Sequence, residues 1–448
     1  MHPLNMTHRF SLSLSAFVLL ACSTMLLAAC DSPTGVEPVD VELEVRFSDE
    51  YGGAAATGAD VTLTNVESQE SYEDVVNENG LISFQDLPAG TYDVAATLTY
   101  SAAAFQDRFG TQPESDEVVF NASQRTVQVT EGANLPVLTL TAGSFGNLVF
   151  KQVYFAGSNP LEGALFRDQF IEIQNNSSET QYLDGLYIMS AYGNNNPDRT
   201  DYVQPNGQFD WSQSIGMPSG INANEDYLYT RWLYQIPGSG QEHPLEPGES
   251  TVIAQTAVNH KAPFEGNDGD VIEVEDPSLT VDLSGADFEV YLGDQLDRPL
   301  ASDIDNPAVP NLIPHYIFGT DLILDLAGRG GYALFRSDTP VDQMPRYPSP
   351  VSREIRDNTT TYIQVPTAQV IDAVQMQPAP NDQVPPKLQD DLDAGFAYVP
   401  GGRFSSNSVI RVAGKQLGTR TVLQDTNNSS EDFTSLERAA PRTSAPQN

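Results

Sequence analysis

Apolar and polar residues alternate along much of the chain, and this alternation constrains the fold more than any other feature. Val39, Val41, Leu43, Val45 and Phe47 lie on one face of an extended segment, which is the period-two pattern of a half-buried strand. Similar segments, separated by turns rich in Gly, Asn and Pro, follow at 61–64, 81–84, 92–94 and 126–129. Helical periodicity is weak and allows one short helix within 384–396. The pattern predicts an all-β fold built from β-sandwiches of the immunoglobulin or prealbumin type.

The first 29 residues have the composition of an export signal. An apolar run follows Arg9 and ends in the small residues Ala28 and Ala29, directly before Cys30. The alternative is a retained transmembrane helix over 10–29, because this run is long enough to span a bilayer. The polar sequence Cys22-Ser23-Thr24 interrupts it, which favours the signal peptide.

The sequence L-A-A-C at 27–30 resembles the lipobox of bacterial lipoproteins, in which the cysteine is lipidated and becomes the new N-terminus. The resemblance implies a signal peptide over 1–29, lipidation of Cys30 and a short polar tether over 30–38. Cys22 is a rival attachment point, but cleavage there would leave the apolar residues 25–29 exposed. A mature chain that begins at Cys30 has no second thiol, so it forms no internal disulfide and has no other cysteine for metal binding or catalysis.

The chain is strongly acidic, with a formal net charge of −39 from 61 acidic and 22 basic residues. The acidic residues are dispersed, which argues against a nucleic-acid partner because phosphate contacts need clustered Lys and Arg. Two explanations remain open. One is the binding of calcium through carboxylates, and the other, which we favour, is a halophilic adaptation in which salt screens the repulsion.

Three motifs in the first region occur in a known order. They are G-A-D-V-T-L at 58–63, N-G-L-I-S-F at 79–84 and L-P-A-G-T-Y at 87–92. Together they resemble the carboxypeptidase regulatory-like β-sandwich, which implies a domain over 39–143. Its fold is shared with carbohydrate-binding domains, but fold alone does not define function.

The second region, 146–433, resembles the lamin-tail domain, an immunoglobulin-like sandwich, here with long insertions. The motifs are F-I-E-I-Q-N-N-S at 170–177, L-D-G-L-Y-I at 183–188 and L-E-P-G-E-S-T-V-I at 245–253. Segments Y-I-Q-V-P at 362–366, V-I-D-A-V at 370–374 and L-Q-D-T-N-N-S-S-E-D-F at 423–433 also resemble an uncharacterised family of Bacteroidota lipoproteins, a domain of unknown function. That resemblance implies the outer membrane as location, on its periplasmic or cell-surface face, and a TonB-dependent transporter as neighbour. Residues 434–448 lack an apolar period and are predicted to be a disordered tail.

Aromatic residues in the insertion between 187 and 234 form the first candidate ligand site. The predicted ligand-binding residues are Trp211, Tyr202, Tyr192 and Trp232. Aromatic rings in polar loops offer flat contact area that suits sugars or a protein partner. Trp211 is expected to be exposed because it lies between Asp210 and Ser212. The alternative is that Trp232 lies on an ordinary strand, together with Tyr227 and Tyr229, and fills the core.

Two charged segments are further candidate ligand sites. Asp268, Asp270 and Glu273 concentrate oxygen donors in one turn, as a calcium loop would, and a solvated acidic turn is the alternative. Near the end of the chain lies the densest basic segment, with Arg403, Arg411, Lys415 and Arg420. It has the charge to receive an acidic ligand or lipid headgroups, but we expect it to pair with the acidic residues of the protein itself.

No catalytic motif is recognisable. The G-x-S-x-G and H-E-x-x-H patterns are absent, and the three histidines after Cys30 lie far apart in sequence, at His243, His260 and His315. We therefore expect a non-enzymatic binding or accessory module at the outer membrane, capturing a ligand beside a TonB-dependent transporter, with no cofactor other than calcium. The alternatives are a carbohydrate-binding, adhesion or structural surface protein and, less favoured, a hydrolase whose carboxylates the sequence does not single out.

Overall fold

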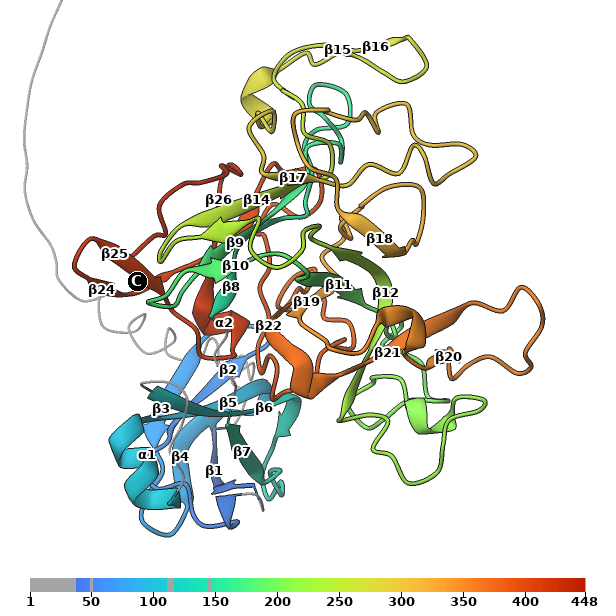
Figure 1. The fold of residues 1–448 in the computed structure, drawn as a ribbon. Helices are drawn as coiled ribbons and strands as arrows, with labels where there is room; N and C mark the ends of the chain where they lie inside the picture. The colour runs from blue at the N-terminus through green and yellow to red at the C-terminus, as the bar shows by residue number, and fades with distance from the viewer. Residues whose placement is uncertain (1–37, 49–50, 111–116, 143–146, 448) are drawn as a thin grey trace, which may run out of the picture.

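Nearly all regular structure in the protein is β-sheet, which confirms the predicted all-β class (Figure 1). The computed structural model describes residues 38–48, 51–110, 117–142 and 147–447. The predicted signal peptide, Cys30 and nearly all of the tether lie outside these residues. Among the residues described, no helix is both long enough and apolar enough to cross a membrane.

The N-terminal part of the chain forms one seven-stranded sheet arrangement, ordered β3-β2-β5-β6-β7-β1-β4, with one short helix (Figure 1, blue to cyan). Its elements are β1(Pro38–Phe47), β2(Asp60–Asn65), β3(Ser71–Val75), β4(Leu81–Pro88), β5(Gly90–Ser101), α1(Ala102–Phe109), β6(Glu117–Val129) and β7(Leu138–Ala142).

Alternation along β1 buries one face of the strand, as the sequence predicts. Its apolar residues pack with those of β2, β5 and β6 around a single core that includes Leu63, Tyr92 and Phe120, and we call this part, residues 38–142, the N-terminal sandwich. The turn before β4 needs glycine. Gly80 has φ +79°, and a Cβ there would lie 2.9 Å from the Cβ of Ala55.

The larger C-terminal part contains two facing sheets and several two-stranded ribbons. One sheet has the order β20-β21-β12-β11-β19-β22, with β18 beside β12, and the other has the order β17-β14-β9-β8-β23-β26. The strands are β8(Leu148–Tyr154), β9(Phe170–Asn175), β10(Gln181–Tyr182), β11(Tyr187–Ala191), β12(Tyr227–Gln235), β13(Pro244–Leu245), β14(Ser250–Ala254), β15(Phe264–Glu265), β16(Val271–Ile272), β17(Phe288–Glu289), β18(Ile313–Tyr316), β19(Gly331–Phe335), β20(Arg346–Pro348), β21(Thr361–Pro366), β22(Val370–Gln375), β23(Ser408–Arg411), β24(Ala413–Leu417), β25(Arg420–Leu423) and β26(Phe433–Leu436). The helical turns are η2(Trp211–Gln213), η3(Pro277–Leu279), η4(Val341–Gln343), η5(Thr367–Gln369) and α2(Ser429–Asp432).

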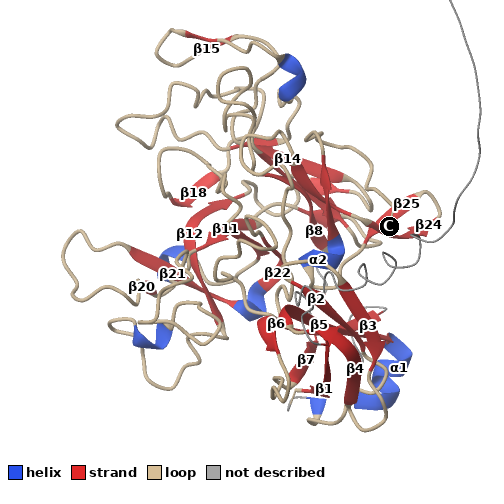
Figure 2. Cartoon of the chain, turned by 180° about the vertical axis from the view of Figure 1, so that it is seen from behind, coloured by secondary structure: helices blue, strands red, loops and turns tan. Residues whose placement is uncertain are grey.

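The two facing sheets share one core, which makes this part a sandwich. Phe150 of β8 and Ile171 of β9 belong to the same buried cluster as Trp232 of β12 and Leu334 of β19. All residues of β8, β9, β11, β19 and β23 are buried. Loops pack around the two sheets, so these strands have no solvent-exposed face, and their polar residues, such as Glu172 and Arg411, are buried as well (Figure 2).

The predicted disordered tail is wrong. β26 pairs with β23, and Ala439 beyond it is buried and donates from its N–H to Ser406 O. Arg442 forms an ion pair with Asp287 at 2.7 Å. A low apolar content therefore does not leave this segment unfolded, because its backbone and charged groups find partners on the sandwich.

The helix prediction was also wrong in its position. Residues 384–396 form turns and bends, and the one helix longer than a single turn among the described residues is α1. Ser101 caps it by accepting the N–H of Ala104, and Gly110 ends it with φ 75°. Phe105 anchors the helix to the N-terminal core.

The outer face of the β3-β2-β5-β6 sheet lies toward the C-terminal sandwich, and polar contacts join the two. Asn121 Nδ2 donates to Thr426 O, and Gln383 Nε2 donates to Asp93 Oδ2 at 2.6 Å. The guanidinium of Arg125 donates to Gly395 O. Side chains from segments about 300 residues apart in sequence therefore meet at this junction.

Candidate functional site

The predicted aromatic site does not form an exposed surface. Trp211 is only 6% exposed, and its ring stacks on that of Tyr229 with centroids 3.5 Å apart. Tyr192 stacks on Tyr362 with centroids 3.7 Å apart. The expectation that Trp211 is exposed was wrong, because a strand that follows it in sequence supplies the ring that covers it.

The remaining aromatic candidates separate from this cluster or contribute little to it. Trp232 lies on β12 and belongs to the core between the two sheets, which confirms the alternative that it fills the core. Tyr202 is partly exposed and has φ 60°. The four residues therefore do not gather at one ligand-facing surface.

The predicted calcium turn is a hairpin between β15 and β16. Asp270 N donates to Asp268 Oδ1 at 3.1 Å, and both side chains are exposed. Asp268, Asp270 and Glu273 are not grouped at a distance that suits one ion. Among the described residues, such a group consists of Asp184, Glu242 and His243, with ligand atoms within 4.8 Å of one another.

The carboxylate of Asp184 already has a structural role. It accepts backbone N–H groups of Gly240, Glu242 and His243. Burial acts to raise the pKa of Asp184, but these hydrogen bonds outweigh it and lower the pKa to about 2. The carboxylate holds the 240–243 loop, which is sufficient to explain the cluster.

The predicted pairing of the basic segment with the acidic residues of the protein is confirmed for Arg411, although this residue is buried rather than exposed. It is 1% exposed and forms ion pairs with Asp372, Asp425 and Asp432 at 2.9–3.1 Å. Arg420 binds backbone oxygens of Asn176 and Ser177. Neither guanidinium is therefore left for an acidic ligand.

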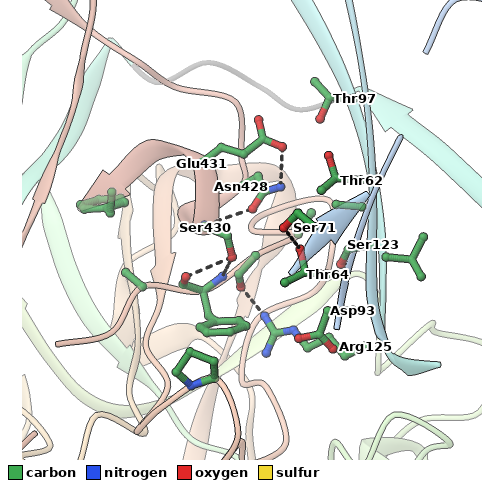
Figure 3. A pocket seen from close by; sticks show the side chains of 18 of the residues that line it. Thr62, Thr64, Ser71, Asp93, Thr97, Ser123, Arg125, Asn428, Ser430 and Glu431 are labelled. Atoms are coloured by element: carbon green, nitrogen blue, oxygen red, sulfur yellow. Dashed lines mark hydrogen bonds between the residues drawn. The ribbon is translucent and has the colours of Figure 1, made fainter. Parts of the chain in front are cut away.

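A cleft of about 1010 Å³ lies between the N-terminal and C-terminal sandwiches and was not predicted (Figure 3). One wall is the outer face of the β3-β2-β5-β6 sheet. Polar side chains cover this face, namely Asp60, Thr62, Thr64, Ser71, Glu73, Asp93, Thr97, Ser123 and Arg125. They alternate with residues of the N-terminal core, so the strand period that forms the core also creates this polar face.

The opposite wall comes from the C-terminal sandwich. It contains Phe396 and Tyr398, followed by Asn428, Ser430 and Glu431 at α2. Asn428 caps α2 through its side-chain oxygen, while its Nδ2 donates to Glu431 Oε1 at 3.0 Å. In Figure 3 Asn428 and Glu431 lie opposite Thr62 and Thr97 of the sheet, whereas Ser430 Oγ is hydrogen-bonded to the backbone of Phe396 on its own wall.

Two polar atoms on β6 lack partners. Ser123 Oγ and Arg125 Nη1 are both buried from solvent, and neither has a hydrogen-bond partner within the described structure. Both residues line the cleft and lie two positions apart on the same face of β6. The Arg125 guanidinium is held in place, since it lies 5.0 Å from the ring centroid of Phe396. Unsatisfied buried groups are costly to the folded protein.

The cleft carries an excess of acid. Five carboxylates line it, from Asp60, Glu73, Asp74, Asp93 and Glu431, against the single cation Arg125 among the described lining residues. Such a field disfavours an anionic ligand and accepts neutral or cationic ones. The local signal was present in the sequence as alternate threonines of β2, but the opposite wall is more than 300 residues away.

The fold and this cleft define an all-β protein of sandwich type with a polar site between its two sandwiches. Residues 246–440 match the family model described as "Protein of unknown function (DUF4876)". The chain is also similar to a solved structure, the "crystal structure of a DUF4876 family protein from Bacteroides thetaiotaomicron VPI-5482". The identity is 23%, the TM-score is 0.48, and the match covers 92% of this chain and 98% of that chain. No match was found among the curated proteins compared.

The predicted resemblance to a domain of unknown function is thus confirmed for residues 246–440. The lipoprotein signal and the carboxypeptidase regulatory-like domain remain predictions.

Proposed function

We propose that this protein is a lipid-anchored, non-enzymatic binding protein that captures a carbohydrate chain in the cleft between its two sandwiches. The observation that carries the proposal is the pair of unpartnered atoms, Ser123 Oγ and Arg125 Nη1, in a cleft of about 1010 Å³. Capture of a glycan at the outer membrane, beside a TonB-dependent transporter, is the role we assign to it.

The chemistry of the cleft suits a hydroxyl-rich ligand. Hydroxyls such as those of Thr62 and Thr97 both donate and accept, as sugar hydroxyls do. The carboxylates supply acceptors, and Arg125 supplies a donor. Tyr398 is half-exposed and offers an aromatic face against which a sugar ring packs. The acidic field favours neutral and amino sugars over sulfated or uronic ones.

We expect Arg125→Met to weaken carbohydrate binding about tenfold or more, because one charge-assisted hydrogen bond contributes about 1.5–3 kcal/mol. Isothermal titration with xylohexaose, maltohexaose, cellohexaose and chitohexaose measures the loss on whichever of these the unmodified protein binds. Ser123→Ala removes a hydroxyl that has no protein partner, so it should weaken binding about three- to tenfold without lowering the melting temperature.

The matched control is Arg356→Met, since Arg356 is exposed and pairs only with exposed Glu354 within the described structure. Its affinity should equal that of the unmodified protein. Unchanged affinity in both cleft variants would contradict the assignment of the cleft. Absence of binding to every oligosaccharide of the panel would contradict the carbohydrate proposal.

The anchor is tested separately. Cys30→Ser should move the protein from the membrane fraction to the soluble fraction, because lipidation requires the thiol. Fractionation followed by immunoblotting measures this, with Cys22→Ser as the matched control that stays with the membrane. Membrane retention of the Cys30 variant would show that another segment holds the protein there.

A further inference from the structure

A second cavity lies along the same strand as the cleft. Its volume is about 1000 Å³, and residues 124–128 of β6 form one side. The loop 197–207 and residues 383–386 form the other sides. Its walls carry the same kind of polar group as the cleft, namely the amides and hydroxyls of Gln124, Thr126, Gln128, Asn134, Thr200, Gln204, Asn206 and Gln383.

Arg125 lines both cavities, so the two meet at this residue. Immediately after it the strand changes direction. Thr126 has φ 54°, and its N–H donates to Asp93 Oδ1 at 2.9 Å. The strand pairing with β5 shifts register at the same place, between Tyr92 and Val94. Ser123 lines the first cavity, while Gln124 before this bulge and Gln128 after it line the second.

The junction is held firmly from both sides. Asp93 accepts the N–H of Thr126 on its own sandwich and the amide of Gln383 from the other. Arg125 is fixed by Gly395 O and the ring of Phe396. The contacts that align the two cavities are therefore the same contacts that join the two sandwiches.

We propose that the two cavities are subsites of one extended groove, in which a linear, uncharged or cationic oligosaccharide lies along β6 and passes Arg125. This inference rests on the proposed function and adds the class of ligand, a polymer rather than a single sugar. Ser123 pairs with Ala95 and Gln128 with Thr91 on β5, so the two positions are four strand steps apart, about 13 Å at roughly 3.3 Å per residue, which is longer than a disaccharide. A short sugar fills only the first cavity, and a longer chain also occupies the second.

The experiment compares chain lengths by isothermal titration of the full-length protein. Dimers and hexamers of β-1,4-xylose, α-1,4-glucose, β-1,4-glucose and N-acetylglucosamine are the probes. For the sugar that binds, we expect the hexamer to bind about tenfold or more tightly than the dimer. Thr200→Trp places a bulky side chain in the second cavity at an exposed position. It should remove the advantage of the hexamer and leave dimer binding unchanged.

Two further variants complete the design. Thr62→Trp fills the first cavity and should weaken both lengths, whereas Thr320→Trp, exposed and outside both cavities, should weaken neither. Equal affinity for dimer and hexamer, with no effect of Thr200→Trp, would overturn the groove and leave the proposed function standing. Failure of every dimer and hexamer to bind would overturn both, and binding of peptides alone would do the same.

Discussion

Replacing Arg411 by methionine should lower the free energy of unfolding by about 3–5 kcal/mol at pH 8, because it leaves buried carboxylates without their cation. Arg411 pairs with Asp372, Asp425 and Asp432 and donates from Nε to Phe150 O at 2.9 Å. Arg411 belongs to one sheet of the sandwich and Asp372 to the other. The ion pair with Asp372 therefore joins the two sheets through the core.

The loss should be smaller at pH 5 than at pH 8. Burial already raises the pKa of Asp372 to about 7 although Arg411 acts to lower it, and burial likewise raises the pKa of Asp432. Without the guanidinium these carboxyls take up protons more readily, and neutral carboxyls cost less to bury. Urea denaturation at the two pH values measures the difference.

Two comparisons make this prediction specific. Arg356→Met removes an exposed pair and should change the free energy of unfolding by less than about 1 kcal/mol. Adding Asp432→Asn to Arg411→Met should recover part of the loss, since it removes one uncompensated charge. An equal loss at both pH values would mean that lost packing against Phe433, 4.7 Å from the guanidinium, outweighs the charge.

The second large effect is on pH dependence, with stability expected to fall as pH rises from about 5 to 8. Burial raises the pKa of several carboxyls, among them Asp168 (about 7), Glu289 (about 7), Asp303 (about 6), Asp321 (about 8) and Asp372 (about 7). Their ordinary values are about 3.9 for Asp and about 4.3 for Glu. At a pH between the ordinary pKa and the raised pKa of such a carboxyl, the unfolded chain has released a proton that the folded chain retains.

The sign follows from this difference in bound protons. A carboxyl whose folded pKa is raised gives its full contribution below its unfolded pKa and loses it as pH rises through the folded pKa. Each group contributes a slope of up to about 1.4 kcal/mol per pH unit. Urea denaturation in 1 M NaCl isolates the effect, because salt screens the dispersed surface charges but not the buried groups.

Asp321→Asn isolates one of these groups. Gln255 Nε2 donates to Asp321 Oδ2 at 2.6 Å, while Gln255 Oε1 has no partner among the residues described. If the amide turns over, Oε1 accepts a hydrogen from a neutral side chain at 321. The variant should therefore gain about 2–4 kcal/mol at pH 8 and little at pH 5.

The matched control is Asp268→Asn on the exposed β15–β16 hairpin, which should change stability at neither pH. A loss of stability in the Asp321 variant at pH 8 would show that the folded protein needs the ionised carboxylate.

Local patterns predicted much of the fold. The alternation over 39–47 corresponds to β1, and the segments at 170–175 and 370–375 are the strands β9 and β22. The signals for α1 were also local, with Ser101 before it and Gly110 after it, but they follow directly on the twelve residues of β5. Next to so long a strand, the capping signals of one short helix do not stand out in the sequence.

Sequence patterns could not predict the candidate site, because contacts between distant segments of the chain create it. Polar neighbours suggested that Trp211 is exposed, but Tyr229 covers it from another element. The polar face of the N-terminal sheet resembles any solvent-facing side until residues 394–398 and 428–435 lie opposite it. No spacing pattern in the sequence indicates that these segments, which are far apart in the chain, lie opposite each other in the fold.

Strand β8 pairs with β23, whose residues come about 260 positions later in the chain, and β26 then pairs with β23. The six-stranded sheet is therefore completed only after nearly the whole polypeptide has left the ribosome. The N-terminal sandwich, whose strands all lie before residue 143, has no such requirement. Contacts so far apart in sequence make folding slow. During synthesis, the first half of the C-terminal sandwich therefore waits for its pairing strand β23, and the cleft, whose second wall includes residues 428–435, cannot form before these residues are made.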